Sequence, residues 1–398
     1  MALFSRGEKT PLGIYIHVPF CRSKCLYCDF YSLPGKPDKR MGQYVKAVVA
    51  HIKETGALAH NYRVDTVYFG GGTPSYLGAE GLIAILNAIR RAFDVSPTAE
   101  ITFEANPDSV TFWLLRRLKS EGFNRVSLGI QCDDDQILQT IGRPHTYAQA
   151  VKAVKRIRRA GYRNLSVDLM YGLPGQTLEN WEKTVDHVLK LDPEHISCYG
   201  LKVEEGTPLY AYQDRYDLPN DDLQADMYLA MVEILRRKGY RQYEISNFSK
   251  REMASKHNLK YWNGGEYLGF GPGASSDFAG KRFSFIRDLQ GYIDGIRDSR
   301  AVVEELHEVP PRERAGEYLM LRIRTSTGIS RQEYERRYLM DFEPLADVLD
   351  QACLRNFAMS NGKGGYRLTP EGFLVSNLII GDLLDAQEES EGPRKWIE

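Results

Sequence analysis

Short apolar runs rich in β-branched residues alternate with amphipathic stretches through the first two thirds of the chain. The intervening stretches, such as 44–52 and 82–93, place apolar residues three and four positions apart, which is typical of helices with one buried face. The apolar runs predict strands at 14–18, 66–69, 101–103, 125–130, 165–170 and 196–201. Six strand-helix units in succession predict an α/β fold built on a parallel sheet, in the form of a partial (β/α)6 TIM-like barrel.

Polar residues and glycines gather where the predicted strands end. Gly70, Gly71 and Gly72 follow the second strand, Glu104 and Gln131 end the next two, and Asp168 lies within the fifth. The carboxyl ends of barrel strands form one mouth, so these residues are expected to surround a single cavity. A glycine run lets backbone N–H groups approach a ligand closely, although a simple tight turn explains such a run equally well.

Three cysteines, Cys21, Cys25 and Cys28, come directly after the first predicted strand. Thiolates prefer iron-sulfur clusters or zinc to magnesium or calcium. Three sulfurs can each bind one iron of a four-iron cluster, which leaves the fourth iron open to an outside ligand. A structural zinc site needs a fourth protein ligand, and the near candidates Asp29 and His17 lack zinc-finger spacing. The spacing therefore favours a cluster, with a zinc site as the alternative.

Composition and charge describe an ordinary globular protein. The 398 residues suggest two domains, with 42% hydrophobic and 26% charged residues. A formal net charge of -1 calls for neither nucleic acid nor an anionic membrane. Residues 1–11 lack the apolar core of a signal peptide, and no run approaches the ~20 apolar residues of a membrane span, so we expect a cytoplasmic protein.

The other three cysteines, Cys132, Cys198 and Cys353, are scattered along the chain. This distribution does not form a disulfide framework. We expect these three side chains to be small residues of the core.

The pattern changes beyond about residue 290. We expect a helix at 317–322, a loop running into a helix at 328–334, a strand and turn at 364–372, and a final apolar helix at 374–384. Helices around a short β-hairpin are typical of a winged helix. The sequence therefore predicts a barrel domain over 1–290 and a helical cap over 291–398.

Winged helices often bind nucleic acid, but the charge of this segment opposes that function. Residues 301–398 contain 12 Lys and Arg against 18 Asp and Glu, a balance of 12 − 18 = −6. A phosphate-binding surface needs the opposite sign. We therefore interpret the cap as a lid or partner surface and expect no nucleic-acid partner.

Several ordered motifs together resemble the radical S-adenosylmethionine (SAM) family. They are the Cys-x3-Cys-x2-Cys loop, the Gly-Gly-Gly-Thr-Pro run at 70–74, the pair of segments 129–131 and 142–145, and the segment 168–177. Within that family the chain resembles the oxygen-independent coproporphyrinogen III oxidase-like group over nearly its whole length.

The resemblance implies a [4Fe-4S] cluster on Cys21, Cys25 and Cys28, with the amino and carboxylate groups of SAM on the open iron. In the family, an electron donor then drives cleavage of SAM to methionine and a 5′-deoxyadenosyl radical. By the same resemblance, Tyr15, Gly71 and Glu104 would hold a first SAM molecule. Positions that match the lining of a second SAM molecule are Tyr27, Gly72, Thr73, Gln131, Arg143 and Asp168, and further adenosyl contacts align with Gly200 and Ser275.

One departure separates the chain from the oxidases themselves. Phe30 stands where the oxidases add a fourth cysteine, and only twenty residues precede Cys21, where the oxidases have a longer leader. Both features resemble the haem chaperone branch of the group, which is thought to bind haem and hand it to respiratory haemoproteins. Haem as cargo is therefore the function the resemblance implies. Radical SAM chemistry on a tetrapyrrole, such as oxidative decarboxylation of coproporphyrinogen III, is the alternative.

A second segment supports the chaperone branch. His257-Asn258-Leu259-Lys260-Tyr261-Trp262 resembles the His-Asn-x-x-Tyr-Trp signature of that branch. Histidine is a common axial ligand of haem iron, and Tyr261 or Trp262 could lie against a porphyrin face. His145 is a rival ligand, and a purely structural, hydrogen-bonded role for His257 is the alternative. Ser275 stands where many relatives have a histidine, so a second haem ligand from that position is not expected.

Overall fold

The computed structural model describes residues 9–36 and 38–389, and their contacts divide the chain into two compact units. The first unit comprises the described residues up to Met231 together with Glu266–His307. The second comprises Val232–Gly265 and the described residues from Glu308 onward. The domain boundary that we expected near residue 290 stays a prediction. In the structure, residues 232–265 belong to the same compact unit as the C-terminal segment.

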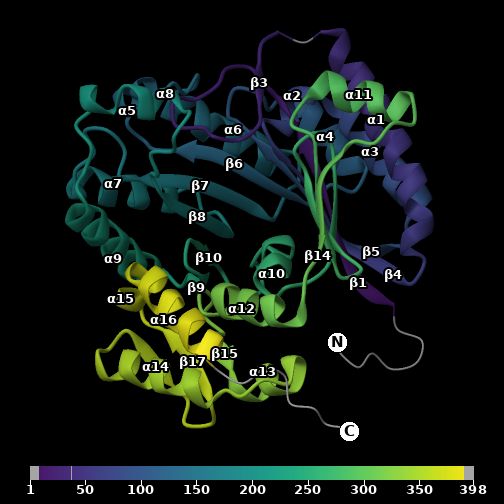
Figure 1. Cartoon of the computed structure of the whole chain (residues 1–398). Coiled ribbons are helices and arrows are strands. Elements are labelled where there is room, and N and C mark those ends of the chain that lie inside the picture. Colours follow the sequence, from purple (N-terminus) through teal and green to yellow (C-terminus); the bar gives the residue numbers. More distant parts are fainter. Residues whose placement is uncertain (1–8, 37, 390–398) are drawn as a thin grey trace, which may run out of the picture. The chain divides into compact units, whose positions relative to one another are not determined.

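A parallel sheet forms the centre of the first unit, as the apolar runs predict (Figure 1). Every neighbouring pair in the series β1-β4-β5-β6-β7-β8 runs parallel. Each of the six predicted strand runs lies within one of these strands, apart from Leu201, which follows the last of them. The strands are β1 (Thr10–Val18), β4 (Tyr62–Gly71), β5 (Val95–Ala105), β6 (Arg125–Gln131), β7 (Leu165–Tyr171) and β8 (His195–Gly200).

Amphipathic helices connect these strands and bury one face against the sheet. In α6, for example, Ala150, Ala153, Val154 and Ile157 are buried, and Thr146 caps the first turn through a reciprocal bond with Gln149. The predicted α/β architecture is thereby confirmed. The longer connecting helices are α1 (Lys39–Thr55), α3 (Ala79–Ala92), α4 (Phe112–Ser120), α6 (Tyr147–Arg159) and α7 (Leu178–Leu189).

Short elements and an antiparallel extension complete the first unit, and the sequence pattern did not predict them. Strand β11 pairs parallel with β1, and β12 and β13 then continue the sheet in antiparallel fashion. The extension consists of β11 (Tyr267–Phe270), β12 (Ser275–Phe278), β13 (Lys281–Phe285), α11 (Leu289–Arg297) and β14 (Val303–Glu308). The short elements are β2 (Phe20–Cys21), β3 (Leu33–Pro34), α2 (Pro74–Leu77), α5 (Asp135–Thr140), α8 (Pro208–Ala211), and the 3-10 turns η1 (Gly56–Ala59) and η2 (Gln213–Arg215).

The second unit combines helices with a small antiparallel sheet of the order β15-β17-β16. The winged-helix-like form predicted for the C-terminal part is confirmed, and the loop expected near 328 contains the short strand β15. The elements are β9 (Arg241–Glu244), β10 (Asn247–Ser249), α10 (Lys256–Trp262), α12 (Pro311–Arg322), β15 (Ile329–Ser330), α13 (Arg331–Tyr338), α14 (Glu343–Leu354), β16 (Ala358–Ser360), β17 (Gly365–Leu368), α15 (Pro370–Leu374) and α16 (Ser376–Glu389). Helix α9 (Asp221–Arg237) runs from the first unit into the second.

The scattered cysteines follow the prediction in two of three cases. Cys132 and Cys198 are buried, whereas Cys353 near the end of α14 is only partly buried. All six cysteines are free thiols. Within the part of the chain that the structure describes, no helix combines the length and the apolar content needed to cross a bilayer.

An aromatic cluster between the sheet and its helices stabilises the first unit. Phe69 of β4, Phe103 of β5 and Phe123 are fully buried, and the ring of Phe123 lies 5.3 Å from that of Phe69 and 5.7 Å from that of Phe103. Tyr162 extends the cluster, with its ring 6.0 Å from that of Phe103. The cluster joins two adjacent strands to the turns beneath them.

The substitution Phe123→Ala should therefore lower the free energy of unfolding by about 3–5 kcal/mol, because it removes a buried ring and leaves a cavity. Urea unfolding followed by circular dichroism measures the change. Leu58→Ala, at an exposed position in the same unit, serves as the control and should shift stability by no more than about 0.5 kcal/mol. Equal effects of the two substitutions would contradict this account of the core.

Candidate functional site

The cysteine loop follows β1 and is tied to the barrel along its length. The N–H of Gly35 donates to the carbonyl of Cys21 over 3.1 Å, where β2 and β3 pair in parallel. In the middle of the loop, the N–H of Leu26 donates to Ile141 over 3.1 Å, and the N–H of Leu209 donates to Leu26 over 2.9 Å. Helices α5 and α8 therefore hold the loop from one side.

A small apolar cluster lies beneath this loop and buries its side chains. Leu26 and Tyr27 of the loop pack against residues from three connections at the carboxyl ends of the strands. Cys21 and Cys25 are buried, while Cys28 is partly exposed. Leu26 and Tyr27 lie between Cys25 and Cys28 in the chain. Their packing against the cluster therefore holds this part of the cysteine loop in place. The cluster consists of Cys132, Ile137, Leu138, Ile141, Met170, Leu173, Leu201 and Leu209.

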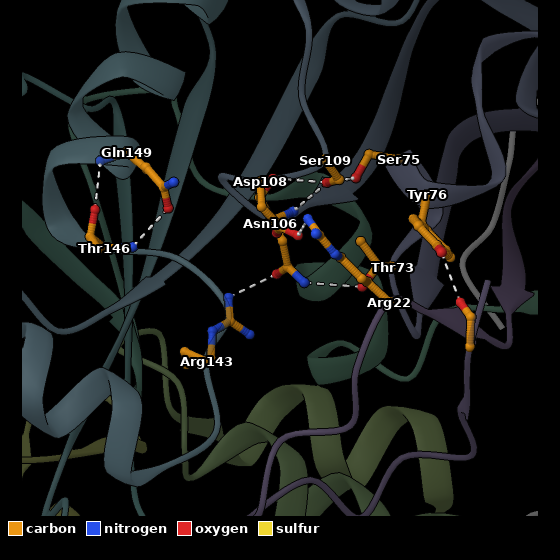
Figure 2. Close-up of polar contacts among 11 residues, drawn as sticks. Arg22, Thr73, Ser75, Tyr76, Asn106, Asp108, Ser109, Arg143, Thr146 and Gln149 are labelled. Atoms are coloured by element: carbon orange, nitrogen blue, oxygen red, sulfur yellow. Dashed lines mark hydrogen bonds and ion pairs between the residues drawn. The ribbon is translucent and has the colours of Figure 1, made fainter. Parts of the chain in front are cut away.

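A polar network connects Cys21 and Cys25 with the strand ends, and Figure 2 shows its central part, in which Asn106 lies between Thr73 and Arg143. The hydroxyl of Thr73 lies 3.4 Å from the sulfur of Cys21 and accepts a hydrogen bond from Nδ2 of Asn106 over 3.1 Å. Arg143 donates to Oδ1 of Asn106 over 2.8 Å and reaches the sulfur of Cys25 at 3.6 Å. Arg143 also donates to the carbonyl of Gly129 over 2.6 Å. The network places one positive charge and one hydroxyl against the sulfurs.

The electrostatics of the loop suit a bound positive group. Burial raises the pKa of the thiols of Cys21 and Cys28, while hydrogen bonds from Thr73 and from the backbone of Phe30 oppose the rise. A buried thiolate is costly alone but is stabilised when a metal centre binds it and displaces the proton. The donor set of three soft sulfurs thus fits an iron-sulfur cluster.

The alternative of a single zinc ion fits less well. Among the described residues, no three His, Cys, Asp or Glu side chains gather closely enough to hold one metal ion. In a four-iron cluster each cysteine binds a different iron, so its sulfurs stand farther apart than the donors around one zinc. His17, a candidate fourth ligand, has both ring nitrogens engaged: Nδ1 with the hydroxyl of Tyr15 at 3.1 Å and Nε2 with the carbonyl of Tyr31 at 2.8 Å.

Two glycines at the end of β4 permit close backbone packing against the cysteine loop. Gly71 has a φ of +105°, and a Cβ atom at this position would lie 2.7 Å from the ring of His17. At Gly72, a Cβ atom would lie 2.8 Å from the carbonyl oxygen of Phe20 and 3.0 Å from the sulfur of Cys21. A side chain at Gly71 would displace the ring of His17, and a side chain at Gly72 would displace the loop that carries the first cysteine.

Glu104 and two tyrosines line the barrel interior beside this turn. The hydroxyl of Tyr68 donates to Oε1 of Glu104 over 2.8 Å, and the rings of Tyr15 and Tyr68 stack with centres 6.4 Å apart. Burial raises the pKa of the Glu104 carboxyl to about 7, although the bonds from Tyr68 and from the backbone of Gly71 oppose the rise. A carboxyl whose pKa lies near neutral pH can accept a proton from an amino group of a ligand or pair with it.

Asp168 lies on β7, where hydroxyl groups of the neighbouring strands β6 and β8 surround its carboxylate. Ser127 donates to its carboxylate with both oxygens at 3.1 Å, and Ser197 also bonds to it. Burial raises the pKa of Asp168, and these bonds partly offset the rise. Nearby Gln131 has a φ of +69°, and its buried Oε1 has no hydrogen-bond partner among the described residues. An amide held in a strained backbone position with a free acceptor points to a ligand beside these strands.

The structure brings most of the predicted site residues to the mouth of one unit. Tyr27 lies in the cysteine loop, and Gly200 ends β8, where a Cβ atom would lie 3.0 Å from the ring of Tyr171. Ser275 starts β12, where it is exposed and bonded to none of the others. His145 is buried, with Nε2 3.2 Å from the carbonyl of Ile130, and burial together with Arg143 lowers its pKa to about 3.

His257 belongs to the second unit and lies on α10. It is buried, with Nε2 2.8 Å from the hydroxyl of Tyr261 and the two rings in an edge-on arrangement. The signature segment thus forms most of the short helix α10, in which the histidine and the tyrosine, four residues apart, face each other. The haem-ligand role of His257 stays a prediction.

Several residues of the site were not predicted from the sequence. Asn106 joins Thr73 to Arg143, Tyr68 binds Glu104, and Ser127 and Ser197 bind Asp168. The sequence signal that could have identified them is the period of two in a strand. A residue two positions from a predicted site residue points to the same face of the sheet. Asn106 follows Glu104 by two residues, and Tyr68 precedes the glycine turn by two.

Comparison with known proteins identifies the family to which this chain is similar. Residues 15–188 match the model of the Radical SAM superfamily. The chain is 35% identical to the Heme chaperone HemW of Bacillus subtilis, over 93% of this chain and 98% of the relative. It is 34% identical to the Heme chaperone HemW of Haemophilus influenzae, over 93% and 97% of the two chains. The solved structure of the coproporphyrinogen III oxidase HemN from Escherichia coli has the same fold, with a TM-score of 0.82, 20% identity, and coverage of 96% and 91%.

The raised pKa of Glu104 predicts a pH dependence of stability in the protein without cluster and SAM. Between the ordinary value of 4.5 and about 7, the folded protein holds a proton that the unfolded chain releases. The free energy of unfolding therefore falls as pH rises through this interval and is level above it. Glu104→Gln should remove about 1–3 kcal/mol of this fall, measured by urea unfolding at pH 5 and pH 8. Exposed Glu182→Gln is the control, and an unchanged slope in Glu104→Gln would refute the assignment.

Proposed function

The chain belongs to the Radical SAM superfamily and, within it, to the HemW family, and on this premise we propose that it binds haem and delivers it to haem-accepting proteins. The observation that carries the proposal is a likeness to haem chaperones that extends over nearly the full length of both chains. The cysteine loop and the strand ends beside it lie within this likeness. The proposed partners are haem, respiratory haem-acceptor proteins and, where SAM is cleaved, an electron donor.

The cofactor that the family implies is a [4Fe-4S] cluster with SAM, and the residues of the loop fit it. Cys21, Cys25 and Cys28 would hold three irons of the cluster, with Arg143 and Thr73 against the sulfurs. When bound, such a cluster supplies an open iron for SAM and a low-potential electron. The protein contributes the buried loop, the neutralising charge and the exclusion of water.

SAM would lie at the carboxyl ends of β1, β4, β5, β6 and β7. Glu104, with its raised pKa, suits the amino group of SAM, and the glycines at the end of β4 leave room for its carboxylate or ribose. Gln131 and Asp168 on the neighbouring strands offer acceptors for hydroxyl or amino groups. One or two SAM molecules are part of the proposal, with Tyr15, Tyr27, Gly200 and Ser275 as further contacts.

The oxidase alternative has less support from the loop itself. Phe30 stands at the position of the fourth cysteine, and 64% of its surface is exposed. An exposed phenyl ring cannot replace a thiol in redox or acid-base chemistry. The likeness to HemN at 20% identity concerns the fold, so it does not favour decarboxylation.

Haem would be ligated by His257, with Tyr261 or Trp262 against the macrocycle. Nε2 of His257 forms a hydrogen bond with the hydroxyl of Tyr261. Ligation of haem iron through this nitrogen therefore requires the side chain of Tyr261 to move away. His145 is the rival candidate in the first unit, where its Nε2 lies 3.2 Å from the carbonyl of Ile130. A cytoplasmic location is part of the proposal and is supported by six free thiols, as in a reducing compartment.

Gly72→Ala tests the packing on which the cluster depends. The new methyl group would lie within 3.0 Å of the sulfur of Cys21, so the purified protein should lose most of its iron and sulfide after anaerobic reconstitution. Overpacking should also cost about 1–3 kcal/mol of stability. Gly42→Ala, at a helical position with open space around it, should retain the cluster. Full iron content in Gly72→Ala would contradict the proposed ligand arrangement.

Anaerobic haem titration separates the chaperone from the enzyme. The reconstituted protein should bind haem with a shifted Soret band and form no decarboxylated product from coproporphyrinogen III in the presence of SAM and reductant. Turnover of that substrate would overturn the proposal. His257→Ala should weaken haem binding and alter the Soret band, whereas Tyr261→Phe should keep the ligand. If His257→Ala leaves the haem affinity and the Soret band unchanged, His257 is not the haem ligand, and the proposed delivery of haem is not affected.

A further inference from the structure

Two neighbouring helices on the outer side of the parallel sheet carry an unbalanced positive charge (Figure 1). Residues 112–120, which form α4, and residues 147–163, which include α6, contain nine Lys and Arg and no Asp or Glu. Two of the nine, Arg117 and Arg158, pair with glutamates outside these helices. The next helix in the series, α7, contains Glu179, Glu182 and Asp186 against Lys183. Because the whole chain has a net charge of only -1, this charge is segregated onto one part of the surface.

Direct contacts join the two helices into one surface. The hydroxyl of Tyr162 donates to the carbonyl of Leu115 over 3.2 Å, and Arg156 donates to the carbonyl of Val110 over 3.4 Å. The guanidinium of Arg159 lies 5.5 Å from the centre of the Phe112 ring. We call this surface the basic face and define it by Trp113, Arg116, Lys152, Lys155, Arg156 and Arg159.

The cations of α6 form a continuous stripe that no acidic side chain neutralises. Lys152, Lys155, Arg156 and Arg159 follow the spacing of one helical face, and all four are exposed. None of the four has an ion pair within the described part of the chain, whereas Arg158 on the same helix pairs with Glu194 at 2.9 Å. Like charges three and four residues apart weaken a helix. A partner of opposite charge would remove that repulsion.

Trp113 adds an apolar anchor to the basic face. At 79% exposure it is the most exposed large hydrophobic side chain of the described residues, and it lies one helical turn from Arg116. Tryptophan and arginine are the residues most enriched at the centres of protein interfaces. A helix that binds a lipid surface presents a row of apolar side chains instead. No other large hydrophobic side chain of α4 or α6 is exposed, which favours a protein partner.

The basic face lies close to the cysteine loop. Helix α4 begins four residues after Asp108, which pairs with Arg22 of the cysteine loop at 3.3 Å. Asn106 in the same connection bonds to Arg143, which contacts the sulfur of Cys25. A protein docked on α4 and α6 would therefore lie beside the mouth of the barrel.

We propose that the basic face is the docking surface for the haem-accepting protein, which binds it through an acidic patch. The inference rests on the proposed function for the identity of the partner and on the charge distribution for its chemistry. Complementary charge would steer the acceptor to the face, and Trp113 would add a desolvated contact at its edge.

The test is haem transfer from the haem-loaded full chain to an acidic b-type apo-cytochrome, followed by stopped-flow absorbance. Direct docking predicts a rate that rises with acceptor concentration and falls with salt. Lys152→Glu with Lys155→Glu should slow transfer about tenfold or more at low salt. The new carboxylates can pair with Arg156 and Arg159, so the helix should not be weakened. Trp113→Ala should slow transfer at all salt concentrations.

The matched control reverses two exposed lysines on α1, Lys46→Glu with Lys53→Glu, and should leave the rate unchanged. Equal rates for the α6 double variant and the unaltered chain would overturn the docking proposal. So would binding of anionic vesicles or duplex DNA that depends on Lys152 and Lys155 while transfer does not.

Equilibrium binding of the haem-free proteins separates this inference from the proposed function. If the unaltered chain binds the apo-cytochrome but transfers no haem, the delivery function fails and the docking surface stands. If it transfers haem at a rate independent of acceptor concentration, delivery stands and the docking surface fails. Binding that is lost in Lys152→Glu with Lys155→Glu and kept in the α1 control supports the basic face.

Discussion

The close approach of the β4 turn to the chain that follows β1 is the constraint on which the rest of the site depends. The N–H of Gly72 donates to the carbonyl of Val18, and the N–H of Thr73 donates to that of Phe20, both over 2.8 Å. No Cβ atom fits between these segments at Gly71 or Gly72. This packing sets the position of Cys21 and, through Thr73 and Asn106, links it to Arg143. A proposed cluster ligand, Cys21, and a counter-charge, Arg143, are therefore parts of one packed edge of the sheet.

Much of this edge could be predicted from the sequence, because it depends on local patterns. Strand periodicity predicted the six strands of the series β1-β4-β5-β6-β7-β8, and residues of the mouth such as Glu104 and Gln131 lie at or near the ends of these strands. The cysteine spacing predicted a thiolate centre without any knowledge of the fold. Side chains that support these residues, such as Asn106 and Tyr68, follow the same period of two, but they have no distinctive chemistry of their own.

The remaining features depend on contacts between distant parts of the chain. Strands β11 to β14 are short and gain stability from pairing at the edge of the parallel sheet, which periodicity does not reveal. Residues 232–265 resemble the other helical connections in sequence, yet they pack with the C-terminal segment and carry His257 into the second unit. The basic face was hidden by a net charge near zero, since its five cations are balanced by acidic residues elsewhere. Sums of charge do not show where the charges lie.

The proposed function rests on the claim that three cysteines hold an iron-sulfur cluster and leave one of its irons open. Electron paramagnetic resonance of the reduced, anaerobically reconstituted protein tests this claim most directly, with and without SAM. The account predicts a [4Fe-4S] signal that changes when SAM binds to the open iron. A signal that SAM leaves unchanged, or a protein that takes up zinc and forms no cluster, would contradict it.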